Sequence, residues 1–124
     1  MNQLDRFEKL ARQLIEGPFQ RLFGGHLHPA DLAEHLLAAV EAGRRSQNGI
    51  SFIPNQYQLA LNPADFALLV EESSRETVLA ELHTYLTGLA AETDYHFGGS
   101  LRVMIAEDEK VQVGRVQVKT KYVA

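Results

Sequence analysis

The sequence contains no cysteine and no tryptophan, and the missing thiols remove several classes of chemistry. The chain cannot use a cysteine nucleophile, a cysteine-ligated zinc site or a redox dithiol. No apolar run approaches the roughly 18 residues of a membrane span, and Leu36–Val40 is typical of the buried side of a helix. Basic residues are the minority, 12 against 16 acidic residues, and the resulting net charge of -4 disfavours nucleic acid as a ligand.

What is present indicates a single folded domain that spans residues 1–124. Of the 124 residues, 45% are hydrophobic and 23% are charged, close to the average for globular domains. A chain of this length can bury enough apolar surface to fold without a disulfide or a metal. The segment Met1–Leu10 lacks the apolar stretch of a signal peptide, so we expect a cytoplasmic location.

Hydrophobic periodicity predicts about four helices. The first covers residues 4–23 with an interruption at Gly17-Pro18, and the second covers Pro29–Gly43. A short helix follows Asn62, whose side chain suits the N-cap position. Ser73 begins a capping box and predicts the start of a longer helix, which carries a regular apolar stripe of Val78, Leu79, Leu82, Tyr85, Leu86 and Leu89.

Alternating apolar and polar residues predict three strands. The first is Gln56–Leu61, preceded by a polar loop at 44–49 and an extended piece at Ile50–Phe52. The other two are expected to form an antiparallel hairpin between Leu101 and Val118. Their apolar residues change phase near Gly114-Arg115, which we interpret as a β-bulge, with a longer turn as the alternative.

The predicted fold class is α+β. We expect a small three-stranded mixed sheet with about four helices packed mainly on one face, in the order ααβααββ. The helical crossover after the first strand is compatible with parallel pairing of that strand to the second. The uncovered face of such a sheet is where a partner could dock.

Few residues are candidates for chemistry. His26, His28 and His35 lie near Asp31 and include the ligand types of a zinc or nickel site, but their spacing matches no established metal motif. We favour the alternative, in which the loop histidines cap and solvate the entry to a helix. Adjacent carboxylates elsewhere point apart, and no nucleophile elbow or phosphate-binding glycine loop is present. We therefore predict no enzyme activity, no catalytic, cofactor-binding or metal-binding residue, and no cofactor.

Several stretches, in a fixed order, resemble one known family. The most specific is Ile53–Tyr57, which leads into Leu59 and Leu61 and is followed by Asp65. The others are Leu4–Glu8, Glu16-Gly17 with Phe19 and Phe23, Pro29 with Leu32-Ala33 and Leu36, Gly99 with Leu101 and Val103, and Gly114 with Val116 and Val118. Together they resemble the N-terminal domain of FhaA-type bacterial proteins over essentially the whole chain.

The resemblance implies a domain that precedes a flexible linker and a forkhead-associated (FHA) module, which binds phosphothreonine. Such proteins are similar to adaptors in Ser/Thr-kinase signalling linked to cell-wall synthesis and division. The residues that bind phosphothreonine belong to the FHA module, so none is carried over onto this sequence. Pro18 falls where the family pattern requires no proline, so we do not expect a straight first helix.

We expect a non-catalytic regulatory or scaffolding module with protein partners, and no direct membrane insertion. The final strand offers a polar, lysine-bearing side made of Arg115, Gln117, Lys119 and Lys121. The same alternation also protects a sheet edge from aggregation. Two alternatives stay open: a small nucleic-acid-binding α+β domain, disfavoured by the charge and the lack of a Gly-x-x-Gly loop, and a His-based metal-binding protein.

Overall fold

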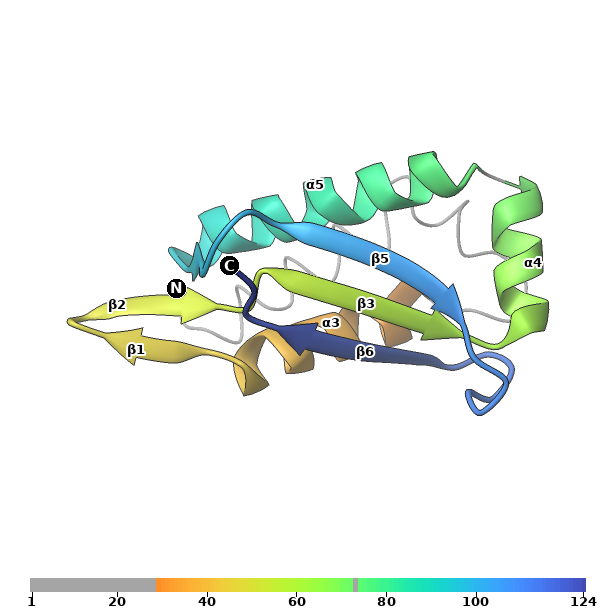
Figure 1. Cartoon of the computed structure of the whole chain (residues 1–124), viewed down its shortest axis with the longest axis horizontal. Helices are drawn as coiled ribbons and strands as arrows, with labels where there is room; N and C mark the ends of the chain where they lie inside the picture. The colour runs from red at the N-terminus through yellow and green to blue at the C-terminus, as the bar shows by residue number, and fades with distance from the viewer. Residues whose placement is uncertain (1–28, 73) are drawn as a thin grey trace.

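The computed structural model describes residues 29–72 and 74–124, and the helix expected over residues 4–23 lies outside this range. The described part is α+β, as predicted, with its strands in two three-stranded sheets instead of one. Three helices are found among the described residues. The elements follow this order (Figure 1): α3 (Pro29–Ala42), β1 (Arg45–Gln47), β2 (Ile50–Ile53), β3 (Gln56–Leu61), α4 (Pro63–Glu72), α5 (Arg75–Thr93), β4 (His96–Phe97), β5 (Arg102–Glu107) and β6 (Val116–Lys121).

The larger sheet has the strand order β5-β3-β6. Gln56 pairs with Arg102 in the parallel neighbour β5 and with Lys121 in the antiparallel neighbour β6. The parallel pairing across the α4–α5 crossover is therefore confirmed. The expected hairpin between the last two strands is wrong, because β3 lies between them.

The central place of β3 follows from its composition. Leu59, Ala60 and Leu61 are all buried, and a central strand satisfies the backbone groups on both of its edges. Stepping over one strand requires a connection that spans about 10 Å, twice the spacing between neighbouring strands. Residues 108–115 are long enough to make that step, so β6 reaches the far side of β3.

The smaller sheet has the order β1-β2-β4 and begins with a hairpin that projects from the rest of the molecule (Figure 1). Its turn is Asn48-Gly49, with φ of 54° and 80°. Two successive positive φ angles match the twist of a two-residue hairpin, and Asn-Gly is the commonest sequence for it. The polar loop expected at 44–49 is therefore wrong over Arg45–Gln47, where the chain forms β1.

The connection from β5 to β6 is held by the first turn of α4. The Gly114 N–H donates to the Asp65 carboxylate at 2.8 Å, and the Asn62 side-chain amide donates to the Val111 carbonyl at 2.9 Å. Gly114 has a φ of 83°, a conformation that favours glycine. The phase change in the sequence thus falls in a long, anchored turn, and the preferred interpretation as a β-bulge is wrong.

The helix boundaries agree with the local signals. The Asn62 side chain accepts from the Ala64 N–H at 2.9 Å, which confirms its role as the cap of α4. The cap of α5 is Ser74, whose hydroxyl accepts from the Thr77 N–H at 3.1 Å. The expectation of Ser73 was one residue early, since Ser74 has the extended backbone and the oxygen in reach of the third helical N–H.

The hydrophobic core lies on one face of the larger sheet. In Figure 1, α3 runs behind β6 and α5 runs beside and behind β5, so both helices cover the same face. The buried residues of this core are Leu32, Ala33, Leu36, Val40, Ile53, Tyr57, Leu59, Leu61, Leu69, Val78, Leu82, Leu86, Leu89, Ala90, Ile105 and Val116. The predicted stripe of α5 is confirmed, with Leu79 and Tyr85 at its partly buried margin.

Asn55 ties the start of β3 to two distant segments. Its side-chain amide donates to the carbonyls of Ser100 and Val123, both at 3.0 Å. Its side-chain oxygen Oδ1 accepts from the Val123 N–H at 2.9 Å, and the residue is only 1% exposed. One buried side chain therefore fixes both the loop before β5 and the segment after β6. Asn55 itself lies in the stretch Ile53–Tyr57, which most specifically carries the family resemblance.

Candidate functional site

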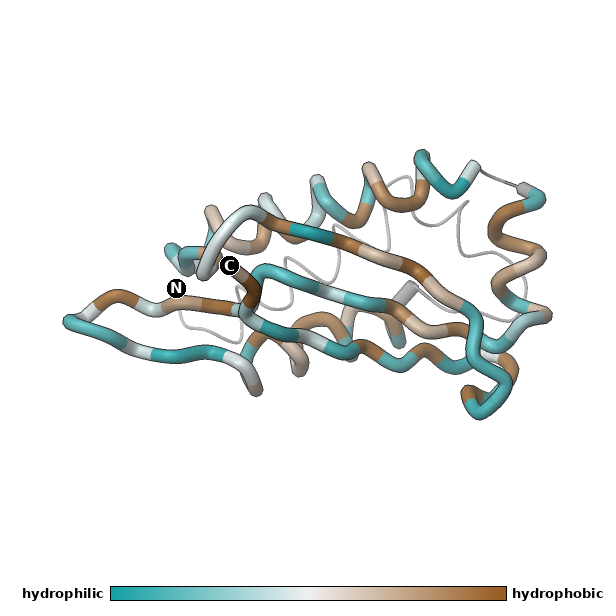
Figure 2. Tube along the Cα trace, in the orientation of Figure 1, coloured by the Kyte–Doolittle hydropathy of each residue, from teal (hydrophilic) through white to brown (hydrophobic). Residues whose placement is uncertain are grey.

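The larger sheet has one face turned away from α3 and α5, toward the viewer in Figure 1. Pleating places alternate residues of each strand on this face, and the register aligns them in three rows. The rows are Arg102–Gln56–Lys121, Met104–Gln58–Lys119 and Ala106–Ala60–Gln117. We call these nine residues the open face. Figure 2 shows that hydrophilic and hydrophobic residues alternate along β6 and that β3 begins with hydrophilic residues.

The open face is basic. Arg102, Lys119 and Lys121 are exposed, and no carboxylate stands in any of the three rows. Within residues 29–72 and 74–124, none of these three side chains has a carboxylate at ion-pair distance. Three like charges without counter-charges on a flat surface attract anionic groups and repel one another.

The acidic residues of the same chain lie elsewhere. In the described ranges they occur on the three helices, at the C-cap Asp94 and at residues 107–109 where β5 ends. The net charge of -4 is therefore distributed unevenly between helices and sheet. Such segregation gives the open face a local positive potential inside a protein that is acidic as a whole.

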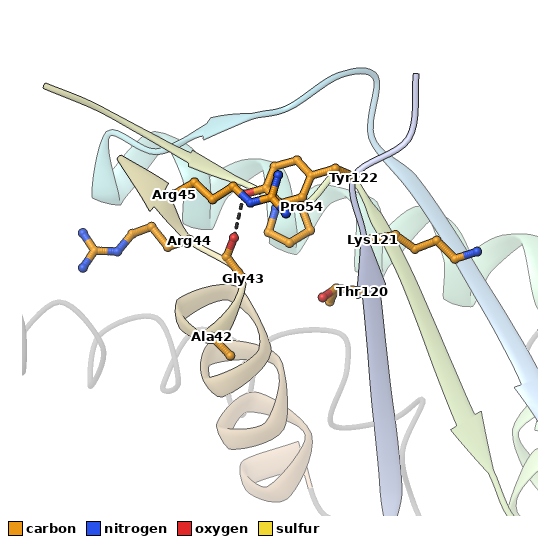
Figure 3. Close-up of a pocket in the computed structure, with 8 residues that line it drawn as sticks. All are labelled: Ala42, Gly43, Arg44, Arg45, Pro54, Thr120, Lys121 and Tyr122. Atoms are coloured by element: carbon orange, nitrogen blue, oxygen red, sulfur yellow. Dashed lines mark hydrogen bonds between the residues drawn. The ribbon is translucent and has the colours of Figure 1, made fainter. Parts of the chain in front are cut away.

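A groove lies beside the end of β6, and Lys121 is part of its lining, although its side chain points away from Arg45 and Tyr122 on the other side of β6 (Figure 3). The groove has a volume of about 500 Å³, and its mouth is open to solvent. Its lining comes from the end of α3, the start of β1, the segment before β3 and the end of β6: Ala42, Gly43, Arg44, Arg45, Pro54, Thr120, Lys121 and Tyr122. Three of these residues are basic and none is acidic.

Tyr122 forms one wall of this groove. Its hydroxyl donates to the Gly43 carbonyl at 2.6 Å and lies 3.1 Å from the Phe52 carbonyl oxygen. The Arg45 guanidinium lies over its ring, 4.2 Å from the centroid, as Figure 3 shows. Burial raises the pKa of the Tyr122 hydroxyl, and the positive charge of Arg45 partly opposes this effect. The hydroxyl therefore remains a neutral donor, and it joins the hairpin to the end of the larger sheet.

Arg44 is engaged differently from Arg45. Its guanidinium Nε lies 3.2 Å from a carboxylate oxygen of Glu41, and it sits over the Tyr95 ring at 5.4 Å. The Tyr95 hydroxyl also donates to Glu41. Arg44 is thus already compensated by a carboxylate, whereas Arg45 contacts an aromatic ring and keeps its charge available.

Of the three histidines considered from the sequence, only His35 lies within the described residues. His35 is exposed on α3 and Asp31 is half-buried on the same helix, while His26 and His28 lie outside the described residues. Among residues 29–72 and 74–124, no three His, Asp or Glu side chains are grouped closely enough to hold a metal ion.

Two features of this surface escaped the sequence reasoning. The lysines of the last strand were noted, but Arg102 was not joined to them, because its place beside β3 depends on the strand order. The Arg45–Tyr122 stack was also missed, although Asn48-Gly49 is a recognised hairpin signal that would have placed Arg45 on a strand.

A comparison with known families gives the same answer as the sequence patterns. The family described as FhaA, N-terminal domain, matches residues 4–119. The chain belongs to the FhaA N-terminal domain family. The match includes β3, the open face up to Lys119, and the stretch Ile53–Tyr57 that carries the resemblance.

A solved structure described as "Rv0020c_Nter structure" has the same fold. It superposes with a TM-score of 0.73 and 22% sequence identity, over 85% of this chain and 79% of that chain. No curated protein matches the sequence significantly. Within the described residues, no helix of this FhaA N-terminal domain has the length and apolar character to span a bilayer.

Proposed function

We propose that this FhaA N-terminal domain is a non-catalytic protein-interaction module, with a regulatory or scaffolding role in an FHA adaptor. The observation that carries the proposal is the open face, a sheet surface rich in unpaired polar and basic groups that the described fold leaves uncovered. Apart from Ala60, its residues are at least partly accessible, and the hydrophobic core lies on the other side of the sheet.

The chemistry of the open face supports binding over catalysis. Its polar groups are guanidinium, ammonium and amide groups, which donate and accept hydrogen bonds. The nine open-face residues include no carboxylate, histidine, serine or thiol to act as an acid, base or nucleophile. A lysine nucleophile needs a desolvated pocket, whereas Lys119 and Lys121 are exposed.

The family supplies the context for such a module. An FHA module binds phosphothreonine, so an adaptor that carries both domains would engage two surfaces in a Ser/Thr-kinase pathway linked to cell-wall synthesis and division. Linking two weak contacts raises the overall affinity without new interactions, because the second contact forms at a high effective concentration. The expected partners are proteins, in the cytoplasm, with neither nucleic acid nor membrane insertion involved.

Affinity capture tests this proposal. The 124-residue chain and the adaptor that contains it are immobilised and exposed to lysate of the source organism, with heat-unfolded chain as the control bait. We expect at least one protein to be enriched on both folded baits and to retrieve the domain in a reciprocal capture.

The outcomes separate the alternatives. No protein enriched over the unfolded bait would overturn the interaction role. Enrichment of RNA or DNA in place of protein would favour the nucleic-acid-binding alternative, and turnover of a retained small molecule would contradict a non-catalytic role.

A further inference from the structure

We propose that the open face binds an extended, acidic segment of a protein partner, with carboxylates at alternate positions. The inference rests on the proposed function as an interaction module and names the chemistry that its surface would recognise. Its basis is the juxtaposition of Arg102, Lys119 and Lys121 with the groove that holds Arg45.

Charge complementarity determines the sign of the charge that the partner segment carries. Arg102, Lys119 and Lys121 have no counter-charge among the residues that the structure describes, and they surround two glutamines on β3. Bringing carboxylates to this face relieves the repulsion between the like charges and leaves the glutamine amides free to bond a backbone. A basic or neutral segment could bond the same glutamine amides through its backbone but would not relieve the repulsion between the like charges.

The spacing of the charges indicates an extended segment. Lys119 and Lys121 are two residues apart on β6, and such residues are separated by about 6.6 Å along a strand. Carboxylates at alternate positions of an extended peptide have the same repeat. A helix brings residues three or four apart onto one side, so its acidic side chains would not keep this register.

The groove extends the basic surface beyond the sheet. Lys121 ends the row that begins with Arg102, and it also belongs to the groove lining, next in sequence to Tyr122, whose ring lies under Arg45. Because Arg44 is paired with Glu41, the uncompensated charges run from Arg102 through Lys121 to Arg45. A peptide that runs along β6 past Lys119 and Lys121 continues at the end of the sheet toward Arg45, at the base of the projecting hairpin.

Acidic protein fits these observations better than nucleic acid. Strong nucleic-acid binding neutralises many phosphates, and a net charge of -4 repels a long polyanion. Bases also stack on aromatic rings, and the nine residues of the open face include no aromatic side chain. A short acidic peptide needs only the local charges.

Lysines on an edge strand also prevent aggregation, and this explanation requires a direct test. Edge protection explains Lys119 and Lys121 on β6 and needs no ligand. It predicts that charge reversal there changes no binding, since glutamate protects an edge as well as lysine does. Peptide binding that depends on the sign of these charges separates the two explanations.

The experiment uses purified chain and labelled nonapeptides, with fluorescence anisotropy at low salt as the readout. The probe alternates glutamate and threonine; the control peptides carry lysine in place of glutamate, or the same residues with the glutamates in one block. A single-stranded oligonucleotide of similar charge is a further probe. The test variant is Lys119→Glu with Lys121→Glu, and the matched control is Lys110→Glu with Arg115→Glu, which makes the same charge change at two exposed positions outside the open face.

We expect the alternating acidic peptide to bind, and the block peptide to bind more weakly. The test variant should bind at least about tenfold more weakly than the native chain, and the control variant within about twofold, because only the first removes facing charges. Binding should also weaken between 50 and 300 mM salt, roughly as expected for exposed ion pairs.

Three results would overturn the inference. They are absence of peptide binding, equal losses in the two double variants, or tighter binding of the oligonucleotide than of the acidic peptide. The proposed interaction role is tested separately, by the affinity capture described above. If a partner is captured equally by the native chain and by the Lys119→Glu, Lys121→Glu variant, the domain still binds a protein, but through a surface other than the open face.

Discussion

The two faces of the β5-β3-β6 sheet differ in what their residues do. On the face under α3 and α5, Tyr57, Leu59 and Leu61 of β3 are all 0% exposed. On the opposite face of the same strand, Gln56 and Gln58 are accessible and flanked by basic side chains. Alternate side chains of the six-residue strand β3 thus point to the core and to the open face, because pleating directs successive side chains to opposite sides of a sheet.

This difference predicts that folding and the proposed binding can be altered independently in one strand. Stability depends mainly on the apolar area removed from water, and that area lies on the helix-covered face. The open face contributes little buried area, so its side chains are free to match a partner. Mutations at covered-face positions of β3 should therefore change stability, and mutations at its open-face positions should change binding.

The largest expected effect comes from truncating the covered face. Leu59→Ala removes a fully buried side chain and leaves a cavity, and we expect a loss of about 3 kcal/mol in the free energy of unfolding. Gln58→Ala, one residue earlier on the open face, should change it by about 0.5 kcal/mol or less. Urea unfolding followed by circular dichroism measures both. Equal losses in the two variants would contradict the division between the faces.

A second prediction concerns a polar residue that belongs to the fold. Asn55→Ala removes three hydrogen bonds and leaves backbone groups of Ser100 and Val123 without partners, and we expect a loss of about 2 kcal/mol. Asn55→Asp has nearly the same shape but cannot donate, so it should also destabilise. A stable Asp variant would show that the two donated bonds matter little.

Local signals in the sequence predicted the elements well. Apolar periodicity with Pro29, Asn62 and Ser73 placed the starts of three helices within about one residue of their observed starts. The alternation of Gln56–Leu61 also identified its buried face. These signals succeed because caps and pleats involve only residues that are close in the chain.

Strand order escaped prediction for a physical reason. Alternation says which side chains share a face, and it says nothing about which strand is the neighbour. Because β5 and β6 follow one another in the sequence, a hairpin was expected. Only the run of apolar residues Leu59–Leu61 at the end of β3 favours placing that strand between them. The open face depends on that order, because β3 is the strand that brings Arg102 into line with Lys121.

A third prediction sharpens the comparison at the loop between the outer strands. Gly114→Ala places a side chain on a residue with φ of 83°, and we expect a loss of roughly 1–2 kcal/mol. Gly88→Ala, in the exposed middle of α5 with no atom near the added methyl group, should instead gain roughly 0.5–1 kcal/mol. Thermal unfolding of both variants gives the signs. A stabilising Gly114→Ala would contradict the anchored turn.

The smallest expected effect is at Tyr57, the one covered-face residue of β3 that carries a polar group. The Tyr57 hydroxyl is buried and has no hydrogen-bond partner among residues 29–72 and 74–124, so it loses its hydration on folding without gaining a hydrogen bond there. Tyr57→Phe should therefore be neutral or stabilising, by up to about 1 kcal/mol near pH 7. Tyr122→Phe is the contrasting variant, since it removes the bond to the Gly43 carbonyl and should destabilise.

Alkaline pH amplifies the Tyr57 effect in a defined direction. Burial, with a smaller contribution from Tyr122, raises the pKa of the Tyr57 hydroxyl above its ordinary value, so the native state keeps a proton that the unfolded state releases above about pH 10. Native stability consequently falls as pH rises beyond that point. Tyr57→Phe removes this proton, and its advantage over the native chain should grow by up to about 1.4 kcal/mol per pH unit. Urea unfolding at pH 7 and pH 11 measures the change. An advantage that stays constant between them would mean that the hydroxyl is hydrated in the native protein, and the covered face would then be less dry than its exposure indicates.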